Sequence, residues 1–147
     1  MTHKISTILT CMLLLTGCGS DTNTTEPVPS LENHNWNLVS YGFQSGEIKE
    51  VIINTNYSLF FDESSSVIGK IDCNTFTSSY ETDNIALNIQ LVAPTEIACP
   101  LSGDIDYELQ NEIIITALST IQSYSFEGSE LIIISIDSTQ LTFSITN

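Results

Sequence analysis

Positive charge is almost absent from this sequence. Lys4, Lys49 and Lys70 are its only lysines, arginine does not occur, and 18 acidic residues bring the formal net charge to −15. A protein that binds nucleic acid neutralises phosphates with lysine and arginine, and electrostatic binding to anionic lipid requires a basic patch. The composition therefore excludes nucleic acid as a partner and excludes a charge-driven attachment to anionic membranes.

The groups that carry catalysis or hold cofactors are equally scarce. The sequence has two histidines and contains no G-x-S-x-G, P-loop or G-x-G-x-x-G motif. Residues 104–108 offer carboxylates at alternate positions, but Leu109 stands where a calcium loop requires glycine. Acidic residues in the first turn of a helix are the simpler interpretation of this stretch. We therefore expect no enzymatic activity, no cofactor and no metal site.

Long hydrophobic runs are also missing, and the apolar run near the N-terminus is short. It covers residues 5–15, whereas about 20 apolar residues are needed to span a bilayer. The run ends at Leu15-Thr16-Gly17-Cys18, which resembles a bacterial lipobox, where lipid is attached to the cysteine and the chain is cut before it. We expect residues 1–17 to be a lipoprotein signal peptide and Cys18 to carry a lipid anchor to the membrane.

The residues after Cys18 predict the cellular location of the protein and a spacer before the domain. Gly19 replaces the aspartate that is associated with retention at the inner membrane, which favours the outer membrane facing the periplasm. Residues 18–34 are polar, with Pro27 and Pro29 spaced for an extended backbone, so we expect a flexible tether here. Residues 35–147 then form a single domain.

From Trp36 onward, apolar and polar residues alternate in short segments separated by turn residues. Ile85, Leu87, Ile89 and Leu91, for example, share one face of a predicted strand. The pattern predicts an α+β, mainly β fold: a curled antiparallel sheet, or half-open barrel, of about eight strands with one helix packed across it. The strand candidates are 35–41, 47–53, 57–61, 67–71, 75–80, 85–91, 123–126, 131–136 and 141–145.

Residues 104–121 break the alternation and have helical periodicity. Two neighbouring apolar stripes run along this predicted helix. We expect the first stripe, with Leu118 and Ile121 beside it, to face the inner side of the sheet, so that Leu109→Ala costs about 2–5 kcal/mol. The first stripe is Ile105, Leu109, Ile113 and Ala117; the second is Tyr107, Ile114, Leu118 and Ile121. The expected contacts on the sheet are Leu59, Phe61, Leu87, Ile89 and Phe143.

Four cysteines occur, and two of them remain for the folded domain. Cys11 is removed with the signal peptide and Cys18 is lipidated, which leaves Cys73 and Cys99 in an oxidising compartment. Their spacing is not C-x-x-C and no basic residue adjoins them, which argues against a redox-active pair. Two buried free thiols are the alternative, but we favour a structural disulfide, worth about 3.5 kcal/mol in the chain-entropy model.

The order of these signals resembles the META domain, the HslJ-type lipoprotein family, from about Trp36 to Ile145. Asp72 and Ile97 depart from the family, which often has glycine and methionine there. The resemblance implies a half-open antiparallel barrel crossed by one helix, as in a lipid-binding pilotin lipoprotein of type III secretion. It also implies a link to heat shock, envelope stress and novobiocin resistance, with no established enzyme activity. The residues that carry it are Trp36-x-Leu38, Gly69, Cys73-Asn74 and Thr95-x-Ile97-Ala98-Cys99.

Two classes of function follow from these expectations. In the first, the monomeric domain binds a lipid or another hydrophobic ligand in an apolar groove between helix and sheet, lined by Leu109, Ile113, Leu87 and Phe61. In the second, it is a structural or chaperone-like, pilotin-like partner of an outer-membrane protein assembly. The geometry of the groove distinguishes the two.

Overall fold

The structure, a computed structural model, describes residues 29–145, so Cys18 and the expected signal peptide lie outside the described residues. The described chain folds into antiparallel strands and one helix, as the sequence pattern predicts. The elements are β1 (Asn35–Phe43), β2 (Ile48–Glu50), β3 (Tyr57–Phe61), β4 (Ser66–Ile71), β5 (Asn74–Asp83), β6 (Ala86–Ile89), α1 (Ile105–Ser119), β7 (Ile121–Glu127), β8 (Glu130–Ser135) and β9 (Thr139–Ile145).

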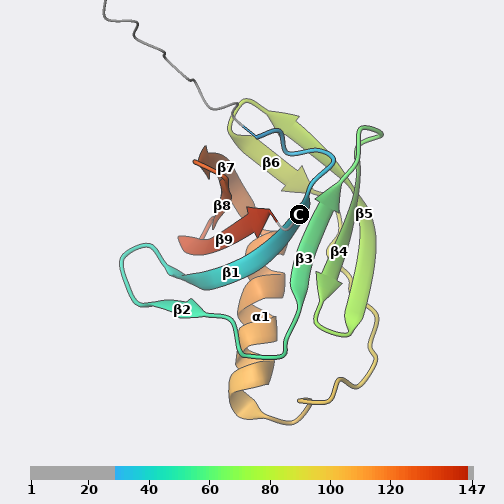
Figure 1. The fold of residues 1–147 in the computed structure, drawn as a ribbon, viewed down its shortest axis with the longest axis vertical. Helices are drawn as coiled ribbons and strands as arrows, with labels where there is room; N and C mark the ends of the chain where they lie inside the picture. The colour runs from blue at the N-terminus through green and yellow to red at the C-terminus, as the bar shows by residue number, and fades with distance from the viewer. Residues whose placement is uncertain (1–28, 146–147) are drawn as a thin grey trace, which may run out of the picture.

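The strands form one curled sheet in the order β6-β5-β4-β3-β1-β9-β8-β7, with the short β2 paired to β1 (Figure 1). The curl brings the two ends of this order, β6 and β7, into contact. There the backbone N–H of Tyr124 donates to the carbonyl of Ile85 at 2.8 Å. The sheet is therefore a nearly closed barrel, and α1 packs against β8 and β9. No helix among residues 29–145 is both long and apolar enough to span a membrane.

Period-2 alternation places the large apolar side chains inside the barrel. Trp36, Phe61 and Leu59 are fully buried there. Gly69 of β4 lies opposite Phe76 of β5, and a Cβ at Gly69 would stand 1.9 Å from a carbon of that ring. Glycine is required at position 69 because the Phe76 ring occupies the space of a side chain.

Two predicted strands are shorter than the alternation suggested. The segment expected at 47–53 is strand only from Ile48 to Glu50, and Ile53 is 83% exposed. In β6, Leu87 and Ile89 face the core, whereas Ile85 and Leu91 lie outside the strand and are exposed. The prediction was wrong at these ends because alternation in sequence does not show where the regular ladder of a strand stops.

The packed domain begins earlier than residue 35. Leu31 is buried, and its carbonyl accepts a hydrogen bond from the indole N–H of Trp36 at 2.8 Å. Glu32 forms an isolated parallel bridge with Phe61. The expected assignment of residues 18–34 to a tether outside the core therefore needs correction at its C-terminal end, where a single apolar residue without a repeating pattern joins the core.

The helix begins at a strong cap. The carboxylate of Asp104 accepts hydrogen bonds from the backbone N–H groups of Asp106 and Tyr107 at 3.0 and 3.1 Å. The carboxylate of Glu108 accepts from the N–H of Gly103 at 3.0 Å. These bonds satisfy N–H groups that have no partner within the helix. The alternating acids at 104–108 thus stabilise the start of α1, which is the simpler of the two interpretations.

The helix turns its second stripe, not its first, toward the barrel. Leu109 is 47% exposed and Ile105 is 83% exposed, so the expected inward orientation was wrong at these two residues. Ala117 and Leu118 are buried as expected, and Ile113 is partly buried against the core. We attribute the orientation to polar contacts on the buried face, whose partners are assembled only in the folded chain. The buried residues of α1 are Tyr107, Gln110, Ile114, Ala117 and Leu118.

Gln110 is the polar centre of this buried face. Its side-chain carbonyl accepts from the N–H of Ile52 at 2.9 Å, and its amide donates to the hydroxyl of Tyr57 at 2.9 Å. The Tyr57 hydroxyl in turn donates to Asn111 at 2.6 Å. Burial raises the pKa of Tyr57 to about 12 despite the bond from Gln110. A fully buried amide is tolerated here because its partners are all in place.

Candidate functional site

Among the residues that carry the family resemblance, those at 73–74 and 95–99 join two segments of the chain, and we call this group the staple. Cys73 and Cys99 are joined by a disulfide, with Cα atoms 5.7 Å apart, as the cysteine count predicts. Asn74 binds the same loop: its amide nitrogen donates to the carbonyl of Ile97 at 3.0 Å, and its oxygen accepts from the N–H of Ile97 and the hydroxyl of Thr95, both at 2.8 Å. The staple fixes the segment that leads into α1, so these residues serve architecture.

Asp72 lies in a turn, at a position where the family often has glycine. Its φ is 54°, in the left-handed region where glycine is favoured and aspartate is tolerated. Its N–H donates to the carbonyl of Asn56 at 2.7 Å, and its carboxylate accepts from the hydroxyl of Tyr107 at 3.0 Å. The turn therefore forms without glycine, and the aspartate adds a bond to the helix.

Asp72, Cys73 and Cys99 also bring three potential metal-ligand atoms within 4.8 Å of one another. The two sulfur atoms are bonded to each other, so neither is a thiolate that could bind a metal. A surface pocket of about 530 Å³ lies beside this cluster and includes Lys70 and Pro100 in its lining. The carboxylate of Asp72 in this pocket already accepts a hydrogen bond from the hydroxyl of Tyr107. We therefore interpret the region as a contact that holds the turn against the helix.

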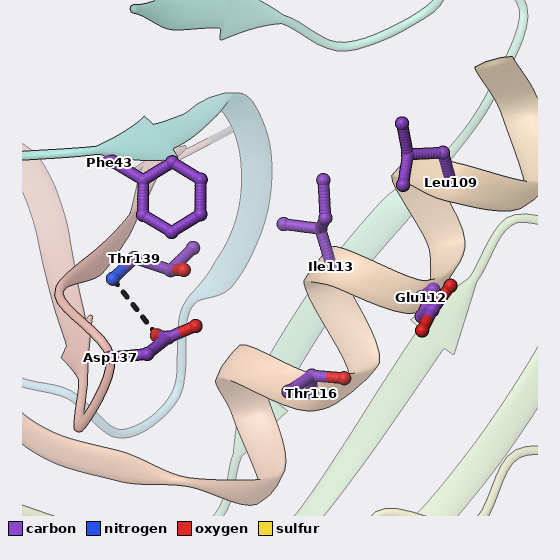
Figure 2. Close-up of a pocket in the computed structure, with 7 residues that line it drawn as sticks. All are labelled: Phe43, Leu109, Glu112, Ile113, Thr116, Asp137 and Thr139. Carbon is purple, nitrogen blue, oxygen red and sulfur yellow. Dashed lines mark hydrogen bonds between the residues drawn. The ribbon is translucent and has the colours of Figure 1, made fainter. Parts of the chain in front are cut away.

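A second surface feature lies where the exposed stripe of α1 faces the β1–β2 hairpin. A pocket of about 200 Å³ has Phe43 on the hairpin side and Leu109 and Ile113 on the helix side (Figure 2). A neighbouring pocket of about 230 Å³ shares Leu109 and Ile113 and is also lined by Tyr41 and Ile52. Because the two pockets share two side chains, we treat them as one feature, the α1–hairpin groove, defined by the residues of both.

The apolar lining residues of this groove, which we call its floor, include side chains that remain open to solvent. Phe43 is 48% exposed and Leu109 is 47% exposed. Other large apolar side chains of the described residues are exposed as well, but these two line one pocket together instead of lying singly. The α1–hairpin groove is therefore the candidate binding site of the described chain.

Four carboxylate side chains are also among the lining residues, and we call the charged lining residues the rim. Glu112 and Asp137 line one part of the groove, and Glu50 and Asp106 line the other, where Lys49 is the one basic lining residue. The hydroxyl of Ser135 and the N–H of Thr139 donate to Asp137 and hold the pKa of its carboxyl below the usual value. Burial, together with the charge of Asp106, raises the pKa of Tyr41. The groove thus has an apolar floor and a predominantly anionic rim.

The structure does not bring the four expected groove residues together. Leu109 and Ile113 line the α1–hairpin groove, whereas Phe61 and Leu87 are buried in the core. The groove lies on the outer side of the helix. Between helix and sheet, where the site was expected, packed side chains fill the space. Lipidation of Cys18 concerns a residue outside the described part of the chain.

Sequence reasoning missed Phe43 and Asp137. Phe43 ends β1 beside a turn, a position that the pattern assigned to a loop region. Asp137 lies between β8 and β9 and accepts bonds that organise that turn. The sequence shows only that Phe43 is an aromatic residue next to a turn. This pattern does not indicate that the helix lies opposite it.

Comparison with known proteins places the chain in a family. The family model of the META domain matches residues 29–146. The chain belongs to the META domain family. No curated protein is significantly similar to the chain.

Solved structures share the fold of this META domain. A protein from Burkholderia xenovorans has 18% sequence identity and a TM-score of 0.61, with 91% of this chain and 99% of that chain covered. A DUF4847-family protein from Bacteroides vulgatus has 15% identity and a TM-score of 0.56, with 78% and 93% covered. At such identities the likeness establishes the fold of the META domain alone.

Proposed function

We propose that this META-domain protein is a non-catalytic binding protein of the bacterial cell envelope. Lipid on Cys18 anchors it to the outer membrane, facing the periplasm, and residues 29–145 present the α1–hairpin groove. The lipobox-like Leu15-Thr16-Gly17-Cys18 supports the anchor. The lack of a nucleophile-and-base pair among the motifs supports a role without catalysis.

The single observation that carries the binding role is the apolar floor of the groove. Phe43, Leu109 and Ile113 converge from two elements and remain partly exposed, although the same fold buries many other large side chains completely. Apolar contact is the main driving force for holding a ligand or partner in such a groove. The proposed occupant is an apolar ligand or segment, and the biological role is tolerance of envelope stress such as heat or novobiocin.

The shape of the groove favours the second candidate function, a partner of an outer-membrane protein assembly, over storage of a lipid. Leu109 and Phe43 are about half exposed, so the site lies at the surface. Lipid chains are held best where nearly all of their surface is buried. A protein segment can cover such a groove while its own remaining surface stays in contact with its parent protein.

Complementation in cells tests this proposal. A strain of the source bacterium that lacks the gene receives wild type, Cys18→Ser, Leu109→Gln or Ile68→Gln, and survival of heat and novobiocin is measured at equal protein levels. Ile68 is the matched control because it is 51% exposed on the outer face of β4. We expect Cys18→Ser and Leu109→Gln to lose protection and Ile68→Gln to retain it. Full protection by Leu109→Gln would remove the groove from the function, and unchanged palmitate labelling of Cys18→Ser would disprove the anchor.

A further inference from the structure

The α1–hairpin groove combines two properties that together narrow the chemistry of its occupant. The floor is apolar, through Phe43, Leu109 and Ile113. The rim is predominantly anionic, and each of the two pockets that share Leu109 and Ile113 is lined by two carboxylates. Its carboxylates are those of Glu50, Asp106, Glu112 and Asp137, and its one ammonium group is that of Lys49.

The charge of the rim argues against several occupants. A fatty acid or an anionic lipid would place its negative head group among four carboxylates. A second copy of this chain carries the same net charge of −15 and contains no arginine, so its surface would repel the rim. An occupant with apolar side chains and positive charges avoids both costs, because attraction of opposite charges also directs its approach.

We propose, building on the function above, that the groove binds a cationic amphipathic segment of a partner polypeptide. Apolar side chains of the segment contact Phe43, Leu109 and Ile113. Its lysine or arginine side chains lie against the carboxylates of the rim, Glu50 and Glu112 among them. Apolar contacts with the floor slow dissociation of the complex. The carboxylates of the rim favour a positively charged segment and accelerate its association.

The experiment measures peptide binding to residues 18–147 carrying Cys18→Ser, a chain that retains the entire packed core, which lies between residues 31 and 145. The probes are three fluorescein-labelled peptides with identical helical spacing of leucine, whose polar positions are all lysine, all glutamine or all glutamate. Fluorescence anisotropy gives the Kd for each. Leu109→Gln and Phe43→Gln alter the floor, Glu50→Gln with Glu112→Gln alters the rim, and Ile68→Gln is the control. Thermal unfolding confirms that each variant is folded.

We expect the lysine peptide to bind most tightly and the glutamate peptide not to bind. Each floor variant should raise the Kd of the lysine peptide about tenfold or more, whereas Ile68→Gln should leave it unchanged. The rim variant should raise the Kd about threefold and reduce its dependence on salt.

The alternative outcomes separate this inference from the proposed function. If the glutamine peptide binds as tightly as the lysine peptide and both depend on Leu109, the cationic occupant is wrong while the binding role stands. If the lysine peptide binds equally well to the floor variants, its attachment is diffuse attraction to an acidic surface, and the inference is overturned. If no peptide binds, the groove is not a docking site for such segments, and both this inference and the second candidate function fall.

Discussion

The two apolar stripes of α1 have similar composition but differ in burial. Tyr107, Ile114 and Leu118 are buried against the barrel, whereas Ile105 and Leu109 on the neighbouring stripe face outward. The buried face also includes Gln110, a polar residue outside both stripes that an amphipathicity argument places on the surface. The contrast teaches that hydrophobic periodicity identifies a helix and its apolar sector. Hydrogen bonds to β3 and to the segment before it accompany the part of that sector that turns inward.

The largest expected effect tests this contrast with two leucines of the same helix. Leu118→Ala should lower the free energy of unfolding by about 3–5 kcal/mol, because Leu118 is 2% exposed and truncation leaves a cavity. Leu109→Ala should lower it by less than about 0.5 kcal/mol, because its side chain is 47% exposed. Urea unfolding followed by circular dichroism measures both. Equal losses in the two variants would show that α1 does not have the orientation described here.

Removal of the disulfide tests how much the crosslink before the helix contributes to the free energy of unfolding. Cys73→Ala should lower the free energy of unfolding by about 3.5 kcal/mol, since the bond joins residues 26 apart in sequence and restricts the unfolded chain. Cys99→Ala should have a comparable effect, and the double variant should lose no more than either single variant. Unfolding in non-reducing buffer measures the losses. Two free thiols in denatured, unreduced wild type would contradict the bond.

The polar centre of the buried face gives a smaller expected effect. Gln110→Met keeps the approximate shape of the side chain but removes the partners of Ile52 and Tyr57, which should cost about 1–3 kcal/mol of unfolding free energy. Glu112→Met, on the exposed side of the same helix, is the matched control and should change stability by less than about 0.5 kcal/mol. A stability of Gln110→Met equal to wild type would mean that the amide does not determine the orientation of α1.

The smallest expected effect is a change in alkaline stability. The pKa of Tyr57 is about 12 in the folded protein against 10.0 for an ordinary tyrosine, so the folded state holds this proton more tightly. The resulting stability is fully present below about pH 10 and is lost as pH rises toward about 12. Tyr57→Phe should therefore flatten the decline of the unfolding midpoint over this range. Tyr80, with a pKa also near 12, keeps part of the decline in the variant. An identical decline in wild type and Tyr57→Phe would show that Tyr57 titrates normally.

The sequence by itself determined the local features of this protein. Alternation predicted the strands, helical periodicity with an acidic start predicted α1, and the two remaining cysteines predicted the disulfide, because each signal depends on residues close in sequence or on residue counts. The resemblance carried by Cys73-Asn74 and residues 95–99 correctly indicated the family and the barrel. These signals require no knowledge of which elements become neighbours.

Only the tertiary structure decided the rotation of α1 and, with it, the location of the groove. Gln110 becomes a buried residue because the N–H of Ile52 and the hydroxyl of Tyr57, more than 50 residues away, stand ready to satisfy its amide. The same rotation leaves Leu109 outside, where it meets Phe43 from β1. Periodicity cannot distinguish two adjacent stripes of equal hydrophobicity. The choice depends on partners that the curled sheet brings to the helix, and those partners exist as a set only after the chain has folded.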